Sequence, residues 1–312
     1  MDAWYCINCF RKDDSMEKRT DLALEIRESF PEGDVEINGV TLSEKYPTDY
    51  IKLTHVKILN KHGERRMKKP CGTYITIEIS ETPVSESSDE IENVIEDCLM
   101  EMLGDVKDKS ILVIGLGNRD ATPDSLGPMV VRQISVTRHA IKEYGKEFGE
   151  RYGFEMVSAL APGVMAQTGM ETSEILAGVI KESSPDQLIL IDALASRSVK
   201  RLGTTIQISN TGISPGAGIG NHRKGLNQKT LGVPVISIGV PTVVDAATIV
   251  SDCMEESLQE KAYSEEEIAA FMAEFQESMV RDLFVTPKNI DELIKDMSEK
   301  IAGAINHCLC NL

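Results

Sequence analysis

Three aspartates of this chain follow runs of apolar residues that are typical of buried strands. Asp124 comes after Ile111–Ile114 and a glycine loop, Asp192 comes directly after Leu188–Ile191, and Asp245 comes shortly after Val233–Val240. In open α/β sheets the carboxyl ends of the strands meet at one edge, where ligands bind. The spacing therefore predicts that these carboxylates converge at one edge of a sheet.

Converging carboxylates suit acid–base chemistry, because two close acids cannot both ionise easily and one keeps its proton. A protonated acid and a carboxylate base on either side of a water molecule can hydrolyse a bond. Asp192 is a strong candidate, since an acid after an apolar strand must be paired, hydrogen-bonded or protonated, and Arg197 is its candidate partner. Structural roles stay open as well: Asp124 suits the first turn of a helix, and Asp245 suits an N-cap.

The elements that must position these acids are predicted from hydrophobic periodicity. Apolar runs alternate with helical patterns, which favours an α/β fold: a three-layer α/β/α sandwich around a mainly parallel sheet, with a β-rich N-terminal part. The stretch 61–72, KHGERRMKKPCG, is expected to be a basic loop between two strands. Helices are expected at 124–137, 264–283 and 290–309.

Composition excludes several classes of protein. The chain has 312 residues, 41% of them hydrophobic, and its net charge of −17 disfavours a nucleic-acid binder. No apolar run reaches the length of a membrane span, and the N-terminus lacks the apolar core of a secretory signal. Seven cysteines, an odd number, favour free thiols in a reducing compartment. We expect an intracellular protein with no membrane partner.

Other motifs fit known chemistries less well. The sequence GLGN at 115–118 begins like a dinucleotide fingerprint, but Asp120 stands where a third glycine is needed. Gly212-Ile-Ser214-Pro-Gly216 matches G-x-S-x-G, yet the residues after the serine disfavour the required helix. No HExxH is present, although His222 could join Asp124 and Asp192 as a metal ligand. The cysteine pairs Cys6/Cys9 and Cys308/Cys310 do not lie in zinc-knuckle sequences.

Several long motifs, in order along most of the chain, resemble the germination protease family of spore-forming bacteria. They read RTDLALE, KPCGTYITIE, VIGLGN, TPDSLGP, VTRH, SALAPGVMAQTGMET, IDALASRS, TTIQISNTGISPGAGIGN, GVPVISIGVPTVVDAATI and FVTPKNID. The resemblance implies an atypical aspartic endopeptidase with a fold similar to that of the hydrogenase maturation endopeptidases. The family's catalytic aspartates lie in the TPD and IDA motifs, which are Asp124 and Asp192 here.

The resemblance also implies how the protein works in the cell. It implies an endopeptidase that degrades small acid-soluble spore proteins at germination, forms a homotetramer, and acts in the cytoplasm of the developing spore and in the spore core. From the charge and the motifs we expect no direct binding of nucleic acid and no need for a metal or cofactor. The alternative on the same fold is a metal-dependent maturation endopeptidase. A non-catalytic binding module, in which the acids only cap helices, also stays open.

By the same resemblance the chain is made as a zymogen. Residues 1–21 lack a core pattern and would form a propeptide, and residues 22–312 would form a single α/β peptidase domain. The segment Thr20–Glu25, TDLALE, resembles the family's processing site, which places the autocatalytic cut between Asp21 and Leu22. A structural role is open here too, because Thr20 could be the N-cap of a first helix.

Overall fold

A computed structural model describes residues 20–30, 37–80, 87–216, 224–260, 263–264, 267 and 283–310. All of the strands in these ranges belong to one sheet. In sheet order they are β1 (Val40–Thr48), β2 (Ile51–Ile58), β3 (Gly72–Ile79), β7 (Thr205–Ser209), β8 (Val235–Asp245), β6 (Gln187–Ser196), β4 (Ser110–Gly115) and β5 (Met156–Leu160), with β9 (Phe284–Val285) paired to β8. Strands β8, β6, β4 and β5 pair in parallel, whereas β1, β2, β3 and β7 extend the sheet in antiparallel pairings. The predicted α/β fold with a β-rich N-terminal part is confirmed.

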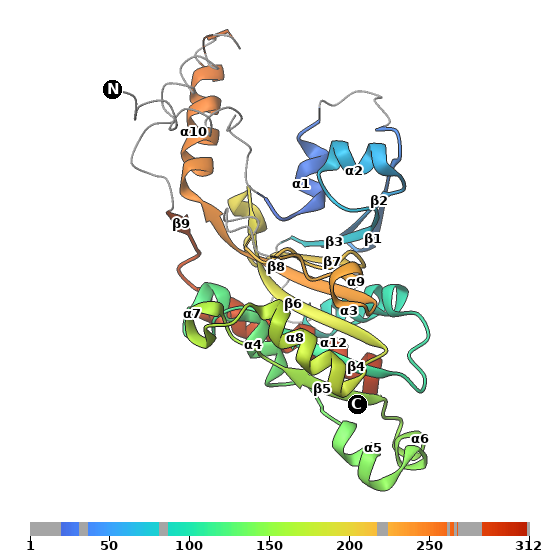
Figure 1. Ribbon diagram of the computed structural model, residues 1–312. Coiled ribbons are helices and arrows are strands. Elements are labelled where there is room, and N and C mark those ends of the chain that lie inside the picture. The colour runs from blue at the N-terminus through green and yellow to red at the C-terminus, as the bar shows by residue number, and fades with distance from the viewer. Residues whose placement is uncertain are drawn as a thin grey trace, which may run out of the picture.

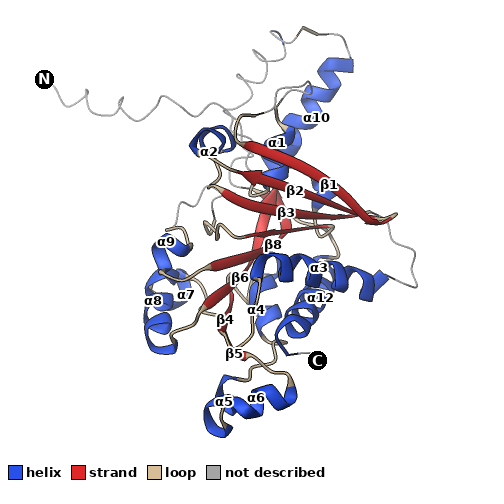
Figure 2. Ribbon diagram, turned by 90° about the vertical axis from the view of Figure 1, so that its right-hand side faces the viewer, coloured by secondary structure: helices blue, strands red, loops and turns tan. Residues whose placement is uncertain are grey.

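Helices cover both faces of this sheet (Figures 1 and 2). Their bounds are α1 (Ala23–Glu28), α2 (Lys61–Met67), α3 (Ser87–Leu103), η1 (Thr122–Asp124), α4 (Leu126–Val131), α5 (Arg138–Tyr144), α6 (Lys146–Tyr152), α7 (Met165–Thr168), α8 (Thr172–Ser183), η2 (Val199–Arg201), α9 (Gln228–Leu231), α10 (Ala246–Glu260) and α12 (Ile290–Cys310). No helix in the described ranges is both long enough and apolar enough to cross a bilayer.

One face of the sheet carries the largest apolar core. Helices α3, α4 and α12 pack there on alternate residues of the strands, such as Ile189, Ile191, Ile208 and Ile238. Figure 2 shows these helices together on one side of the sheet and α7, α8 and α9 on the other. Because strand side chains alternate between faces, the residues between these isoleucines point to the second face.

The second face has two apolar clusters with a polar stretch between them. One cluster joins α8 to β4 and β6 through Leu176, Ile114 and Leu190. The other joins α1 and α2 to β2 and β3, with Ala23 and Met67 at its centre. Between the clusters, the strand residues that point to this face are mainly polar: Asp192, Gln207, Ser209 and Ser237, with Gly239 among them. The sheet therefore has an opening in its apolar cover at this point.

The structure corrects two of the expected elements. The basic stretch 61–72 is not a loop: it begins with α2, because Asn60 caps that helix by accepting hydrogen bonds from the backbone N–H of His62 (3.0 Å) and Gly63 (3.0 Å). The helix expected over 124–137 is shorter, since α4 ends at Val131. The C-terminal helix is confirmed as α12, while the expected helix 264–283 lies almost wholly outside the described residues.

Replacing Asn60 tests the capping of α2, the helix that leads to Lys69 in the site described below. Asn60→Ala removes both capping hydrogen bonds, so we expect the free energy of unfolding to fall by about 1 kcal/mol. Chemical denaturation of the variant measures this loss. Asn60→Asp, which keeps the oxygen that accepts the capping hydrogen bonds, is the control, and an Asn60→Ala protein no less stable than Asn60→Asp would show that the cap contributes nothing.

Candidate active site

Asp192 lies in the middle of β6, not after its end as the sequence suggested, because β6 continues to Ser196 by pairing with β8. The neighbouring strand β4 ends earlier: Gly115 is opposite Ile191, and the Leu116 N–H donates to the Ile191 carbonyl (2.8 Å). Asp192 is the next residue along β6, so it stands where β4 ceases to cover the strand. Asp192 is only 6% exposed, and its carboxylate accepts a hydrogen bond from the Ala193 N–H (3.1 Å).

Strand register sets Asp192 in one row with Gly239 and Gln207. Gly239 of β8 is the partner of both Asp192 in β6 and Gln207 in β7, which places the two outer Cα atoms about 10 Å apart. A side chain at 239 would not fit, since an added Cβ would lie 2.4 Å from the Leu194 side chain. The Leu194 side chain occupies the space that the glycine leaves, and a pocket of about 90 Å³ lies above this row, lined by Asp192, Gln207, Gly239 and other residues.

The remaining lining of this pocket is mostly polar and comes from distant parts of the chain. It includes Asp21, Lys69, Ser209, Thr211, Ser214, Asn227 and Ser237. The hydroxyls of Ser209 and Ser237 lie 2.8 Å apart, and that of Ser209 lies 3.1 Å from Thr211. Hydrogen bonds of this kind let polar groups stay within a sheet that is otherwise apolar.

Asp124 is held by the glycine loop that follows β4. It ends η1, and its carboxylate accepts a hydrogen bond from the Asn118 N–H (2.8 Å). Gly117 makes this fold possible: its φ is +107°, and a Cβ there would lie 2.1 Å from the Asp124 carbonyl oxygen. The short helix η1 packs against β6 and β8, so Asp124 lies at the same end of the parallel strands as Asp192. Asp124 is not among the described residues that line the pocket of Asp192.

The third acid and the expected partner of Asp192 are placed elsewhere. Asp245 ends β8, six residues beyond the row of Asp192, and caps α10 by accepting from the Ala247 N–H (3.3 Å). Arg197 does not pair with Asp192, because its guanidinium binds Asp252 at 2.9 and 3.2 Å. Asp245 is thus a capping residue, as its sequence context allowed.

Two loops approach the site. The loop containing α7 is tied to the β4–η1 loop by Gln167, which donates to Asn118 (2.8 Å) and Asp120 (3.1 Å). The glycine-rich loop contributes Gly212, Ser214 and Gly216 to the pocket, and His222 lies outside the described residues. Within the described ranges, no three or more His, Cys, Asp or Glu side chains are grouped to hold a metal ion.

The segment that resembles a processing site is bound in this pocket. Asp21 pairs with β6 on the edge that β4 leaves open: its N–H donates to the Ala195 carbonyl (2.9 Å), and its carboxylate accepts from the Ala195 N–H (3.0 Å). Gln207 holds the peptide on both sides of Leu22, donating to the Asp21 carbonyl (3.3 Å) and accepting from the Ala23 N–H (2.7 Å). Leu22 and Ala23 are fully buried. The Asp21 carbonyl is therefore fixed at a pocket that Asp192 also lines.

Glu25 anchors the same segment four residues after Asp21. Its carboxylate accepts from the backbone N–H groups of Arg197 (2.8 Å) and Ser198 (3.1 Å), and it pairs with the Arg201 guanidinium (3.3 Å). Thr20 donates its hydroxyl to the same carboxylate. Glu25 is only 4% exposed, so these partners replace the water that its charge would otherwise require.

Sequence reasoning missed Lys69 and Gln207, which both touch the bound segment. The Lys69 ammonium donates to the Asp21 carbonyl at 2.9 Å. Burial lowers the pKa of Lys69, and the Asp21 carboxylate partly opposes this shift. The only local signal was a lysine before Pro70 in a basic stretch, which is equally typical of a solvated surface.

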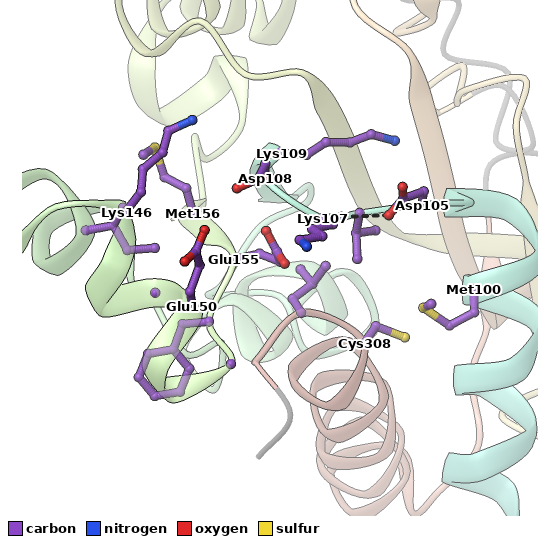
Figure 3. A pocket seen from close by; sticks show the side chains of 16 residues that line it. Met100, Asp105, Lys107, Asp108, Lys109, Lys146, Glu150, Glu155, Met156 and Cys308 are labelled. Carbon is purple, nitrogen blue, oxygen red and sulfur yellow. Dashed lines mark hydrogen bonds between the residues drawn. The ribbon is translucent and has the colours of Figure 1, made fainter.

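A hollow larger than the Asp192 pocket lies elsewhere, at the amino ends of β4 and β5. It has a volume of about 600 Å³ and is lined by Lys109, Met156, Cys308 and residues of α6. Figure 3 shows lysines and carboxylates interspersed around its wall. Burial raises the pKa of Glu155 there, while a hydrogen bond from the Asp108 backbone opposes the rise and the charges of Asp108 and Asp105 add to it. Ligands of parallel α/β sheets bind at the opposite ends of the strands, so the pocket of Asp192 is the better candidate.

The Asp192 pocket holds the Asp21 carbonyl, and Asp124 lies at the same end of the parallel strands. A peptide held in a pocket that a buried acid lines is an arrangement that a peptidase can use. The family model described as germination protease (Peptidase A25) matches residues 16–261. The chain therefore belongs to the germination protease family and is a protease, which confirms the resemblance read from the sequence motifs.

Individual relatives match along nearly the whole chain. A germination protease of Caldanaerobacter subterraneus subsp. tengcongensis is 47% identical over 310 residues, covering 93% of this chain and 94% of that protein. Those of Clostridium perfringens strain 13 and Bacillus cereus strain B4264 are 43% and 38% identical, and each alignment covers 93% of this chain and 94% or 93% of the relative. Among solved structures, the [NiFe] hydrogenase maturation protease HycI of Thermococcus kodakarensis KOD1 aligns with 67% of this chain and 99% of its own, at 16% identity and a TM-score of 0.33.

The state of the cysteines, and the lack of a group of metal-binding side chains in the described ranges, predict how the protein responds to inhibitors. Burial raises the pKa of Cys98 and Cys308 to about 12 and that of Cys310 to about 11, so these thiols stay protonated and unreactive at neutral pH. The exposed thiols Cys71 and Cys253 do not line the pocket of Asp192. We expect peptide cleavage to stay within about twofold of its initial rate after alkylation or chelation.

The measurement is the cleavage rate before and after treatment with iodoacetamide, and separately with EDTA. Mass spectrometry identifies which cysteines are modified, and a metal assay of the purified protein is the control for chelation. Stoichiometric metal that is lost together with activity, and restores it when added back, would favour the metal-dependent alternative.

Proposed function

We propose that this protein is an aspartic endopeptidase in which Asp124 and Asp192 form the acid–base pair. One carboxylate takes a proton from water, which attacks the carbonyl carbon of the cut bond. The other, protonated, gives its proton to the leaving nitrogen. The carbon–nitrogen bond breaks, leaving a carboxylate on one product and an amine on the other. The position of both acids at one end of the parallel strands supports this assignment.

The observation that carries the proposal is that Lys69 and Gln207 hold the Asp21 carbonyl at the pocket that Asp192 lines. A segment that is only a helix start does not need its carbonyl held by two side chains next to a buried acid. We infer that residues 1–21 are a propeptide, that residues 22–312 form the peptidase domain, and that the first substrate is the chain's own Asp21–Leu22 bond. The protein would be made as a zymogen and processed by itself.

The later substrates follow from the same recognition. The pocket holds an acidic residue before the cut bond, a buried apolar residue after it, and a glutamate further along at Arg201. We propose that small acid-soluble spore proteins with this pattern are cut at germination, in the cytoplasm of the spore, by a homotetramer of this chain. The membership of the germination protease family supports this substrate class.

Asp124→Asn and Asp192→Asn test the acid–base pair. Each variant keeps the shape of its side chain but loses the titratable group, so we expect cleavage of an acid-soluble spore protein to slow by about 10²–10⁴-fold with an unchanged fold. Asp245→Asn is the matched control: it should keep its activity and lose at most about 1 kcal/mol of stability, because Asn also caps helices.

Rates come from gel or mass-spectrometric assays, and circular dichroism checks the fold. Near-normal cleavage by a folded Asp124→Asn or Asp192→Asn protein would remove that residue from the mechanism.

Self-processing is tested on the intact precursor. Mildly acidic pH should favour protonation of one member of a carboxylate pair, which is the active form of such a pair. We expect incubation at about pH 5 to release a product that begins at Leu22, and we expect none from the Asp192→Asn precursor. Mass spectrometry reads the new N-terminus over time. A precursor that degrades spore proteins at full rate with residues 1–21 attached would contradict the zymogen proposal.

A further inference from the structure

Lys69 reaches the pocket because of how α2 ends. Lys68 takes a left-handed conformation (φ 49°) directly after the helix, and Pro70 follows, so the chain turns at Lys69. The Pro70 carbonyl accepts a hydrogen bond from the Tyr74 hydroxyl (2.9 Å), which fixes the turn to β3. Lys69 as a whole is half-buried. It lines the pocket together with Asp21, Asp192 and Gln207.

Two donors meet on one carbonyl oxygen in this pocket. The Lys69 ammonium lies 2.9 Å from the Asp21 carbonyl oxygen, and the Gln207 side-chain amide lies 3.3 Å from the same atom. A pair of donors on the carbonyl of a bond to be cut is the arrangement of an oxyanion hole, where donors lie about 2.7–3.1 Å from the oxygen that becomes charged. Lys69 meets this distance, and Gln207 stands slightly beyond it.

The cost of placing an ammonium here argues against a purely structural role. Burial lowers the pKa of Lys69, so folding disfavours its charged form at neutral pH. A neutral methionine of similar length would fill the same space without this cost. The charge has a use where negative charge develops on the neighbouring oxygen during the reaction.

We propose that Lys69, assisted by Gln207, is a catalytic residue that stabilises the oxyanion formed on the carbonyl of the cut bond. The proposal rests on the proposed function, because it concerns the Asp21–Leu22 bond. Water oxygen bonds to the Asp21 carbonyl carbon as the carbonyl π pair moves to the oxygen, and one carboxylate takes the water proton. Lys69 and Gln207 hold the negative oxygen. When the π bond re-forms, the bond to the Leu22 nitrogen breaks and that nitrogen receives the proton of the second acid.

The competing explanation is that Lys69 only anchors the segment before the reaction. Removing an anchor loosens the bound segment, whereas removing a group that acts on the transition state slows the reaction and leaves binding unchanged. The two roles therefore separate if the binding of residues 20–28 and the rate of cleavage are measured on the same protein.

The test compares Lys69→Met with Lys57→Met in the full-length chain. Lys57 is an exposed residue of β2 and is the matched control. The rate constant for cleavage after Asp21 is followed by mass spectrometry under single-turnover conditions. Binding of the segment is followed as amide hydrogen-exchange protection of residues 20–28, in the Asp192→Asn background so that the bond stays intact. Melting temperature checks that each variant is folded.

We expect Lys69→Met to slow self-cleavage by about 10²–10³-fold, with the protection of residues 20–28 unchanged. Its melting temperature at neutral pH should equal or exceed that of the wild type, because a group with a lowered pKa in the fold weakens stability while it is charged. Lys57→Met should cleave at the wild-type rate.

Cleavage of Lys69→Met within threefold of the wild-type rate would overturn the proposal, and so would a slowing that is matched by lost protection. Either result leaves the proposed function intact. Failure of the wild-type chain to cut itself under any of the tested conditions contradicts self-processing itself, and the Lys69 proposal falls with it.

Discussion

The burial of Asp192 within an apolar strand is the constraint on which the rest of the site depends. Leu190 and Leu194, on the same face of β6, are buried, so a carboxylate between them must find polar neighbours or keep its proton. The fold meets this need by ending β4 at Gly115 and by placing hydroxyl and amide side chains on the adjoining strands. The apolar cover of the sheet is interrupted at the same place, between the cluster of α8 and that of α1 and α2. The gap in the apolar cover that places polar groups around Asp192 is also where the segment that contains Asp21 binds.

The bound N-terminal segment completes this opening. Because β6 continues beyond β4, the backbone N–H and C=O groups of Ala195 lack a strand partner on that edge, and Asp21 takes the place of one. The side chain of Asp21 accepts the hydrogen bond that a strand carbonyl would normally accept. Main-chain pairing of this kind can hold a peptide in place, and side-chain contacts can then distinguish its sequence. Here the pairing involves Asp21, just before the start of α1. In this segment the buried Glu25 is held by Arg201 and by two backbone N–H groups.

The antiparallel half of the sheet has a role beyond enlarging the core. Strand β7 carries Gln207, and Lys69 lies in the turn that leads into β3. In the proposed mechanism the parallel half of the sheet would supply the acids, and the antiparallel half would supply the donors to the carbonyl. Joining both halves through the β7–β8 pairing sets the spacing between Asp192 and Gln207 by strand geometry, whereas the turn after α2 places Lys69 and the loop after β4 places Asp124. Sites built on strands hold their groups more closely than sites built on loops. Helix α2 contributes by ending where Lys69 must turn into the pocket.

The sequence by itself determined the elements whose patterns are local. The apolar runs at 111–114, 188–191 and 233–240 predicted the central strands, because continuous β-branched and aliphatic residues favour buried parallel strands. The glycine loop and the motif Thr122-Pro123-Asp124 predicted a tight turn into a helix, and the acids Asp124 and Asp192 were both identified as candidates. The capping role of Asp245 was also readable, since it depends on residues within one helical turn.

Only the tertiary structure decided which groups meet. The pairing of Asp21 with Ala195 joins residues 174 positions apart, and that of Lys69 with Asp21 joins residues 48 apart. No local pattern encodes such contacts, because they follow from strand order, register and the early end of β4. The same reason explains the errors of sequence reasoning: Arg197 binds Asp252 instead of Asp192, and β6 runs past Asp192 because β8 pairs with it as far as Ser196. Residue types suggested the chemistry, while the long-range packing of the sheet chose the residues that can perform it.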